Sequence, residues 1–148
     1  MTVRVQEAAF DISAEIAALT EGRAEAGAAV AFVGLVREMG LGPAEAMTLE
    51  HYPGMTEKAL AGIEAEARAR WPLTEVTVIH RVGRLAPGDR IVLVAVASRH
   101  RQAAFEAAAF LMDHLKTRAP FWKKEAGAAG GRWVDARESD DAAVARWR

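Results

Sequence analysis

The chain has 148 residues, a formal net charge of −1, 51% hydrophobic residues and no cysteine. This length and composition are typical of one globular domain with a sizeable core, and the near-zero charge argues against a general binder of nucleic acids or membrane surfaces. The absence of cysteine excludes disulfides, thiolate nucleophiles and cysteine-ligated metals, and it fits a cytoplasmic protein. We expect residues 1–148 to form a single domain without a signal peptide.

Hydrophobic periodicity and capping residues predict the elements of the first half of the chain. They are strands over residues 3–7, 28–36 and 46–52, and helices over residues 11–20 and 55–70. The segment 28–36 is apolar throughout, which is typical of a strand buried on both faces. The helix over 55–70 follows Pro53-Gly54 and carries one apolar stripe, with Leu60 and Ile63 at its centre.

In the second half of the chain, the sequence predicts two neighbouring antiparallel strands, over residues 75–82 and 91–98. They are joined by a turn at Pro87-Gly88-Asp89. A helix is predicted over residues 100–116. One side of this helix is shared by a set of mostly apolar residues: Phe105, Ala108, Ala109, Met112 and Lys116. The remainder is predicted to be irregular or short-stranded to residue 125, a loop over 126–131, a strand over 132–134 and a polar, mobile tail from about 138.

The stretch Leu115-Lys-Thr-Arg-Ala-Pro-Phe-Trp-Lys-Lys-Glu125 combines cations with two large aromatic residues. A solvated charged surface does not require Phe121 and Trp122 among its lysines. A reactive lysine does, because apolar surroundings lower the pKa of an ammonium group and free its lone pair. The alternative is structural: Lys116 complements the dipole at a helix C-terminus, and a packed turn follows.

A second group of polar residues, Ser98-Arg99-His100-Arg101, lies where a buried strand leads into a helix. Cations at a helix N-terminus oppose the helix dipole, so they are best explained by a bound anion. The alternative is a set of solvated side chains on a loop. Arg37 also leaves a buried strand, beside a glycine-rich loop. None of the histidines has the spacing of a metal site, and His80 is expected to be a hydrogen-bonded core or interface residue.

These stretches together resemble the large, catalytic subunit of molybdopterin synthase. The matching residues are Phe32-Val33-Gly34-Leu35-Val36-Arg37, Leu49-Glu50-His51-Tyr52-Pro53-Gly54-Met55, His80-Arg81-Val82-Gly83, Ser98-Arg99-His100-Arg101, Leu115-Lys116, Ala119-Pro120-Phe121-Trp122-Lys123-Lys124-Glu125, Arg132-Trp133-Val134 and Ala136-Arg137-Glu138. The match extends over roughly residues 3–140. Each piece is weak alone, and it is their order and spacing that make the resemblance specific.

The resemblance implies an α+β fold, an α/β hammerhead with an additional small antiparallel β subdomain. It implies conversion of cyclic pyranopterin monophosphate to molybdopterin, a reaction that installs a dithiolene. The sulfur would arrive as a thiocarboxylate on the C-terminal glycine of a small ubiquitin-like partner subunit, so the enzyme itself would need no cysteine. The implied assembly is a heterotetramer built on a homodimer of large subunits, and neither a cofactor nor a metal is expected.

The resemblance also implies roles for individual residues. Lys116 is the expected catalytic lysine, as general acid or base or as the group that holds the partner's glycine carbonyl. Lys123 is the second catalytic candidate, and both lysines are expected to contact substrate. Arg37, His100 and Arg101 are the expected phosphate ligands, with the His-Arg pair supplied by the other large subunit. Supporting candidates are Met112, Lys124, Glu125 and Arg137.

Two other functions are compatible with the same residues. A non-catalytic dimeric module that binds a phosphorylated small molecule would use the arginines and the histidine but give the lysines no chemical role. Lysine variants would then change affinity alone. A nucleic-acid binder would use a Lys/Trp patch, against which the net charge of −1 counts. Its binding to oligonucleotides would depend on salt.

Overall fold

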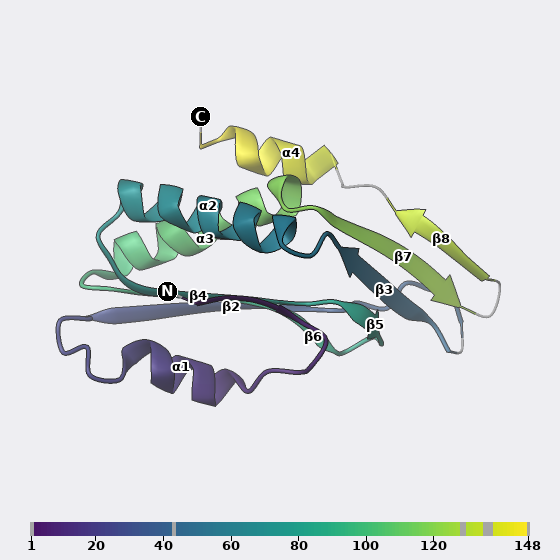
Figure 1. Cartoon of the computed structure of the whole chain (residues 1–148), viewed down its shortest axis with the longest axis horizontal. Coiled ribbons are helices and arrows are strands. Elements are labelled where there is room, and N and C mark those ends of the chain that lie inside the picture. Colours follow the sequence, from purple (N-terminus) through teal and green to yellow (C-terminus); the bar gives the residue numbers. More distant parts are fainter. Residues whose placement is uncertain (1, 43, 128–129, 135–137, 148) are drawn as a thin grey trace.

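The computed structural model describes residues 2–42, 44–127, 130–134 and 138–147. The elements along the chain are β1 (Thr2–Gln6), α1 (Ile12–Thr20), β2 (Ala28–Leu35), β3 (Ala46–His51), α2 (Met55–Arg70), β4 (Leu73–Arg81), β5 (Gly83–Leu85), β6 (Arg90–Ser98), α3 (Arg101–Arg118), β7 (Phe121–Gly127), β8 (Gly130–Val134) and α4 (Glu138–Ala145). They form an α+β fold, an α/β hammerhead from which a second, smaller sheet projects (Figure 1). This is the predicted fold class.

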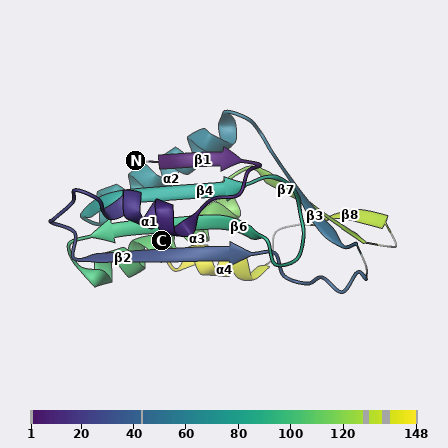
Figure 2. The same cartoon turned by 90° about the horizontal axis from the view of Figure 1, so that it is seen from below.

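The larger sheet has the strand order β1-β4-β6-β2. Strand β1 is parallel to β4, and the other two pairings are antiparallel. The antiparallel pairing of β4 with β6 confirms the prediction for the two long apolar strands of the second half. Helices α2 and α3 cover one face of this sheet and α1 covers the other, as Figures 1 and 2 show from two directions.

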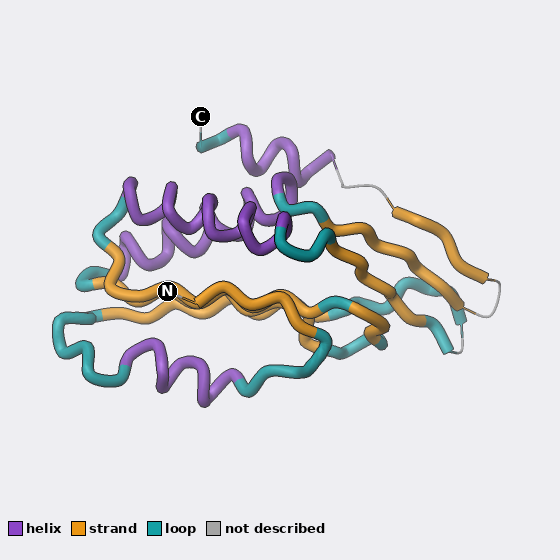
Figure 3. Tube along the Cα trace, viewed as in Figure 1, coloured by secondary structure: helices purple, strands orange, loops and turns teal. Residues whose placement is uncertain are grey.

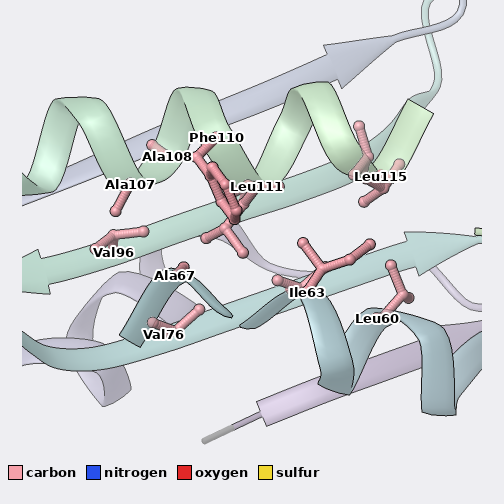
Figure 4. Packing of buried hydrophobic residues seen from close by; sticks show 13 residues of the cluster. Leu60, Ile63, Ala67, Val76, Val96, Ala107, Ala108, Phe110, Leu111 and Leu115 are labelled. Atoms are coloured by element: carbon pink, nitrogen blue, oxygen red, sulfur yellow. The ribbon is translucent and has the colours of Figure 1, made fainter. Parts of the chain in front are cut away.

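The main core lies between the larger sheet and helices α2 and α3 (Figure 4). Apolar side chains at helical spacing project from α2 and α3 onto the central strands: Leu60, Ile63, Ala67, Phe110, Leu111 and Leu115 meet Val76 and Val96. Burial of each large side chain contributes about 1.5–3 kcal/mol to folding. The predicted apolar stripe of the 55–70 helix is therefore confirmed at its centre, and α3 is held against the sheet along its whole length.

Strand β2 differs from its prediction as a strand buried on both faces. It lies at the edge of the larger sheet, and each of its residues is half-buried or exposed. Phe32 is 43% exposed and Leu35 is 59% exposed. An edge strand has a neighbouring strand on one side alone. The apolar side chains of β2 are therefore not all buried within one copy of the chain.

The smaller sheet has the order β5-β3-β7-β8 and is antiparallel throughout. Strand β5 was not predicted, and β7 is one continuous strand where the sequence predicted an irregular or short-stranded segment to residue 125 and a loop from residue 126. Pairing with β3 explains the difference, because six residues of β7 are in register with β3, from Ala46 opposite Ala126 to His51 opposite Phe121. The tube in Figure 3 shows this sheet as an extension beyond the end of the helices.

The C-terminal residues form helix α4 where the polar composition suggested a mobile tail. The Trp147 ring, just after α4, packs edge-on against Trp71 and Phe110 at centroid distances of 5.7 and 5.5 Å. Its indole nitrogen donates a hydrogen bond to Asp113 of α3 at 2.7 Å. The Trp147 contacts and an ion pair between Arg146 and Asp113 therefore dock the C-terminal segment on the core.

The corner between α3 and β7 is fastened to α2 by a buried hydroxyl group. The Thr56 side chain is 0% exposed. Its oxygen accepts a hydrogen bond from the Tyr52 backbone N–H at 3.0 Å and donates to the Pro120 carbonyl at 3.0 Å. The start of α2 and the exit from α3 are therefore held together by one side chain.

Replacing Thr56 by valine keeps the volume and removes both hydrogen bonds, which leaves the Pro120 carbonyl and the Tyr52 N–H without this partner. We expect Thr56→Val to lower the free energy of unfolding by about 1–3 kcal/mol, measured by urea denaturation. The matched control is Thr117→Val, because among the described residues the Thr117 hydroxyl bonds carbonyls of its own helix, both at 3.4 Å. Equal losses in the two variants would contradict the proposed fastening.

Candidate active site

Lys116 lies in the last turn of α3, on the side that faces away from the core. The helix ends at Arg118, and Ala119 has extended backbone angles before Pro120. Proline cannot continue a helix and restricts the residue before it to extended conformations, so the sequence itself sets this end. Leu115 is buried under the helix, and the next residue, Lys116, therefore points outward. A cation in this position also complements the helix dipole.

Lys116 lines a cavity of about 490 Å³ between α3 and the edge strand β2. The lining residues are Val30, Ala31, Phe32, Phe105, Ala108, Ala109, Met112, Asp113 and Lys116. The five α3 residues predicted to share one side of the helix are all among them. The walls are mostly apolar, with a cation and a carboxylate at one end. Met112, named from sequence as a supporting candidate, lies one turn before Lys116 and lines the same cavity.

Lys123 comes to the same end of the molecule from β7. Alternation along the strand places Phe121, Lys123 and Glu125 on the face that is partly buried. The Lys123 ammonium lies 3.6 Å from the Glu125 carboxylate. We call the segment from Lys116 to Lys123, where α3 ends and β7 begins, the lysine corner.

The same alternation places Trp122 and Lys124 on the opposite face of β7. Trp122 is 48% exposed and does not share the inner face with Phe121. The expectation that both aromatic residues would surround one lysine is therefore wrong for Trp122. Lys124, a supporting candidate, is exposed and is not brought together with Lys123.

The base of the lysine corner is a buried histidine that the sequence predicted only as a core or interface residue. His80, on β4, is 5% exposed, and its ring stacks on Phe121 with centroids 4.0 Å apart. Its Nδ1 donates a hydrogen bond to the Arg81 carbonyl at 2.8 Å. The prediction of a hydrogen-bonded buried histidine is confirmed. The alternation of apolar residues along β4 already indicated this buried face.

Burial lowers the pKa of His80 to about 4. The hydrogen bond to the Arg81 carbonyl opposes this effect, and the charges of Lys116 and His51 add to it. His51 is half-buried on β3 directly opposite Phe121, and its Nε2 lies 4.0 Å from a Glu57 carboxylate oxygen. His80 is therefore a neutral side chain close to two groups that can be positively charged.

The predicted anion ligands His100 and Arg101 lie at the other end of α3. His100 is the N-cap residue and makes no side-chain capping hydrogen bond, and both residues are exposed. Ser98 is instead structural, because its fully buried hydroxyl donates to the Pro72 carbonyl at 2.8 Å. Arg101 and Lys116 are 15 positions apart, which corresponds to roughly 22 Å along a helix. One chain does not bring them together.

Strand β2 ends at the end of the larger sheet nearest β3 and β7 (Figure 2). Arg37, two residues after this strand, is exposed. It therefore lies at the same end of the fold as the lysine corner, unlike His100 and Arg101. Arg137, the remaining supporting candidate, lies outside the described residues. Sequence reasoning missed the contributions of Phe32 and Val30 to the cavity, although the uninterrupted apolar run of β2 was a signal for them.

The pKa of His80 makes stability depend on pH in a defined direction. The folded value of about 4 is below the ordinary 6.5, so between these values the unfolded chain binds a proton that the folded chain does not. Stability should therefore rise with pH across this window, by up to about 3 kcal/mol, and level off above it. We expect His80→Phe to remove this part of the slope in urea denaturation between pH 7 and 4. Parallel slopes for the two proteins would contradict the assignment.

Comparisons with known proteins agree with the resemblance. The family described as "MoaE protein" matches residues 5–118. The molybdopterin synthase catalytic subunit of Ralstonia nicotianae is 62% identical over 148 residues, which cover 99% of this chain and 84% of the relative. The molybdopterin biosynthesis MoaE protein of Burkholderia ambifaria has a similar structure, with a TM-score of 0.85, 56% identity and coverage of 99% and 98% of the two chains. The molybdopterin synthase structure from Staphylococcus aureus gives a TM-score of 0.81 at 33% identity, over 88% of this chain and 95% of that one. This chain therefore belongs to the MoaE family.

Proposed function

We propose that the chain is the catalytic subunit of a molybdopterin synthase, a sulfurtransferase of molybdenum cofactor biosynthesis. It converts cyclic pyranopterin monophosphate to molybdopterin with two sulfur atoms from the C-terminal glycine thiocarboxylate of a small ubiquitin-like subunit. The observation that carries the proposal is the lysine corner, in a chain that is 62% identical to a curated catalytic subunit. The fold gathers Lys116 and Lys123 from different elements at one end of the molecule.

The chemistry of these residues suits sulfur transfer from a carrier. The chain has no cysteine, so the sulfur nucleophile must come from the partner. A thiocarboxylate and the acyl intermediates derived from it carry or develop negative charge, which positioned ammonium groups stabilise. Lys116, at the cavity, acts as general acid or base or holds the glycine carbonyl. Lys123, paired with Glu125, positions the thiocarboxylate.

The phosphate of the substrate requires cations that one copy of the chain supplies only in part. Arg37 is at the lysine end, whereas His100 and Arg101 are roughly 22 Å from Lys116 along α3. We infer that a second copy provides the His-Arg pair, in a homodimer with one small subunit at each end. The exposed apolar side chains of Phe32 and Leu35 on the edge strand, and of Phe105 on α3, support such an interface.

The proposed location of the reaction is the cytoplasm, where a chain without cysteine has no need of an oxidising compartment. Across the described residues, the helices are too short or too polar to cross a lipid bilayer. No group of three or more potential metal ligands occurs in the part of the chain that the structure describes.

Lys116→Ala should lower the rate of molybdopterin formation by about 10²–10⁴-fold, because it removes the acid-base group from the cavity. The assay mixes the purified chain with the thiocarboxylated small subunit and cyclic pyranopterin monophosphate, and follows the fluorescent oxidation product of molybdopterin. Lys58→Ala, which removes an exposed lysine from α2, is the control and should retain full activity. Normal turnover by Lys116→Ala would remove this residue from the mechanism.

Hybrid dimers test whether the site is shared between two copies. Lys116→Ala and Arg101→Ala should each be impaired, Arg101→Ala mainly through weaker substrate binding. In a hybrid of the two, one of the two sites would contain wild-type Lys116 together with wild-type Arg101. We therefore expect co-expressed, differently tagged hybrids to recover up to about half of the wild-type activity, by the symmetry of a twofold dimer. Purified hybrids with no recovery would place the whole site within one chain.

A further inference from the structure

His80 is a buried titratable residue that the proposed reaction does not use. It lies on the same face of β4 as Val76 and Val78, which pack against α2 and α3. It is the last residue of this series, so its ring lies beneath the end of α3 and the start of β7. The contact with Phe121 and the electrostatic effect of Lys116 on the ring agree with this position.

The hydrogen bond of His80 fixes which ring nitrogen carries the proton. A backbone carbonyl can only accept, so Nδ1, at 2.8 Å from the Arg81 oxygen, must be the donor. In the neutral ring Nε2 is then an acceptor with a free lone pair.

The stacking partner of His80 connects it with both lysines. The two rings are nearly parallel, with an angle of 24° and centroids 4.0 Å apart. Phe121 is the first residue of β7, five positions after Lys116 and two before Lys123. A ring that fixes Phe121 therefore fixes the segment between the two ammonium groups.

The chemical character of the imidazole suits this place better than that of other side chains. A cation here would repel Lys116 and the half-buried His51, the two titratable groups whose charges act on the ring from α3 and β3. A carboxylate would bind the Lys116 ammonium in an ion pair and hold it away from substrate. A phenyl ring could stack on Phe121 but would present no acceptor. A neutral histidine provides both the stacking surface and an acceptor.

We propose that His80 is a positioning residue of the lysine corner. Its ring holds Phe121 in place from below, and its Nε2 accepts a hydrogen bond on the side of Lys116, so that Lys116 and Lys123 keep a fixed relation during sulfur transfer. This inference rests on the proposed function for its kinetic test, but the position of Lys116 can be measured without any turnover.

The kinetic test compares two substitutions of His80 in the complex with the thiocarboxylated small subunit. His80→Phe keeps an aromatic ring and removes both nitrogens, and we expect it to lower kcat by about 10- to 100-fold with KM for the pterin substrate unchanged. His80→Gln places an amide oxygen near the position of Nε2, and it should recover part of that loss. A merely structural role would instead lower activity in proportion to the loss of stability in both variants.

The chain offers a closely matched control in His114→Phe. His114, on α3, also bonds a backbone carbonyl through Nδ1, that of Phe110 at 3.0 Å, and its ring contacts Phe110 at a centroid distance of 4.1 Å. It is not among the residues that line the cavity. The variant should therefore keep wild-type kcat. Wild-type kcat in His80→Phe, or equal losses in the two phenylalanine variants, would overturn the inference.

The second measurement is NMR of the chain with ¹³C-methylated lysines, in which Lys116→Arg identifies the Lys116 signal. We expect His80→Phe to shift this signal and His114→Phe to leave it in place, with Lys58 as an internal reference. An unshifted Lys116 signal in His80→Phe would overturn the inference even if the wild-type protein made no molybdopterin. Absence of product from the wild-type complex would refute the proposed function separately.

Discussion

The arrangement of the whole site depends on where α3 is forced to end. Pro120 has no N–H to donate and constrains Ala119 to an extended conformation, so the helix cannot continue into the second sheet. The chain must instead turn and enter β7 at once. The Thr56 hydroxyl holds the Pro120 carbonyl, and His80 holds the first ring of the strand. Helix α3, which packs on the larger sheet, and strand β7 of the smaller sheet thereby meet at one corner.

This corner gives its two lysines different surroundings. Lys123 has the Glu125 carboxylate at 3.6 Å, on the same inner face of β7. Lys116 lines a largely apolar cavity and has the neutral His80 ring close to it. A carboxylate neighbour and an apolar wall are different electrostatic settings for an ammonium group. The roles proposed for the two lysines, proton transfer for Lys116 and positioning for Lys123, correspond to this difference.

Much of this fold could be predicted from sequence because its signals are local. The central strands, the two long helices and the shared side of α3 all follow from periodicity, and Pro120 marks the corner. Local sequence signals gave wrong predictions where the structure of a strand depends on pairing with strands far away in the sequence. Strand β7 acquires its order from β3, and the exposure of β2 depends on its place at the sheet edge. Neither the order of β7 nor the exposure of β2 can be predicted from the residues of that strand alone.

The candidate site divides in the same way. The sequence already predicted Lys116 at the C-terminus and the His100-Arg101 pair at the N-terminus of one helix, and the structure places them at opposite ends of α3. The opposite faces of Trp122 and Lys123 likewise follow from strand alternation, which became visible only once β7 was known to be a strand. His80 was recognised as buried, and its relation to Lys116 required the tertiary structure.

The edge strand β2 has a consequence for the cell that makes this protein. An open strand edge with apolar side chains, here Phe32 and Leu35, is a template for indiscriminate strand pairing when a chain is alone. In the proposed homodimer, a copy without its partner should therefore aggregate and be proteolysed more readily than an assembled one. Subunit supply should be matched to assembly, and surplus chains should be removed quickly by quality control.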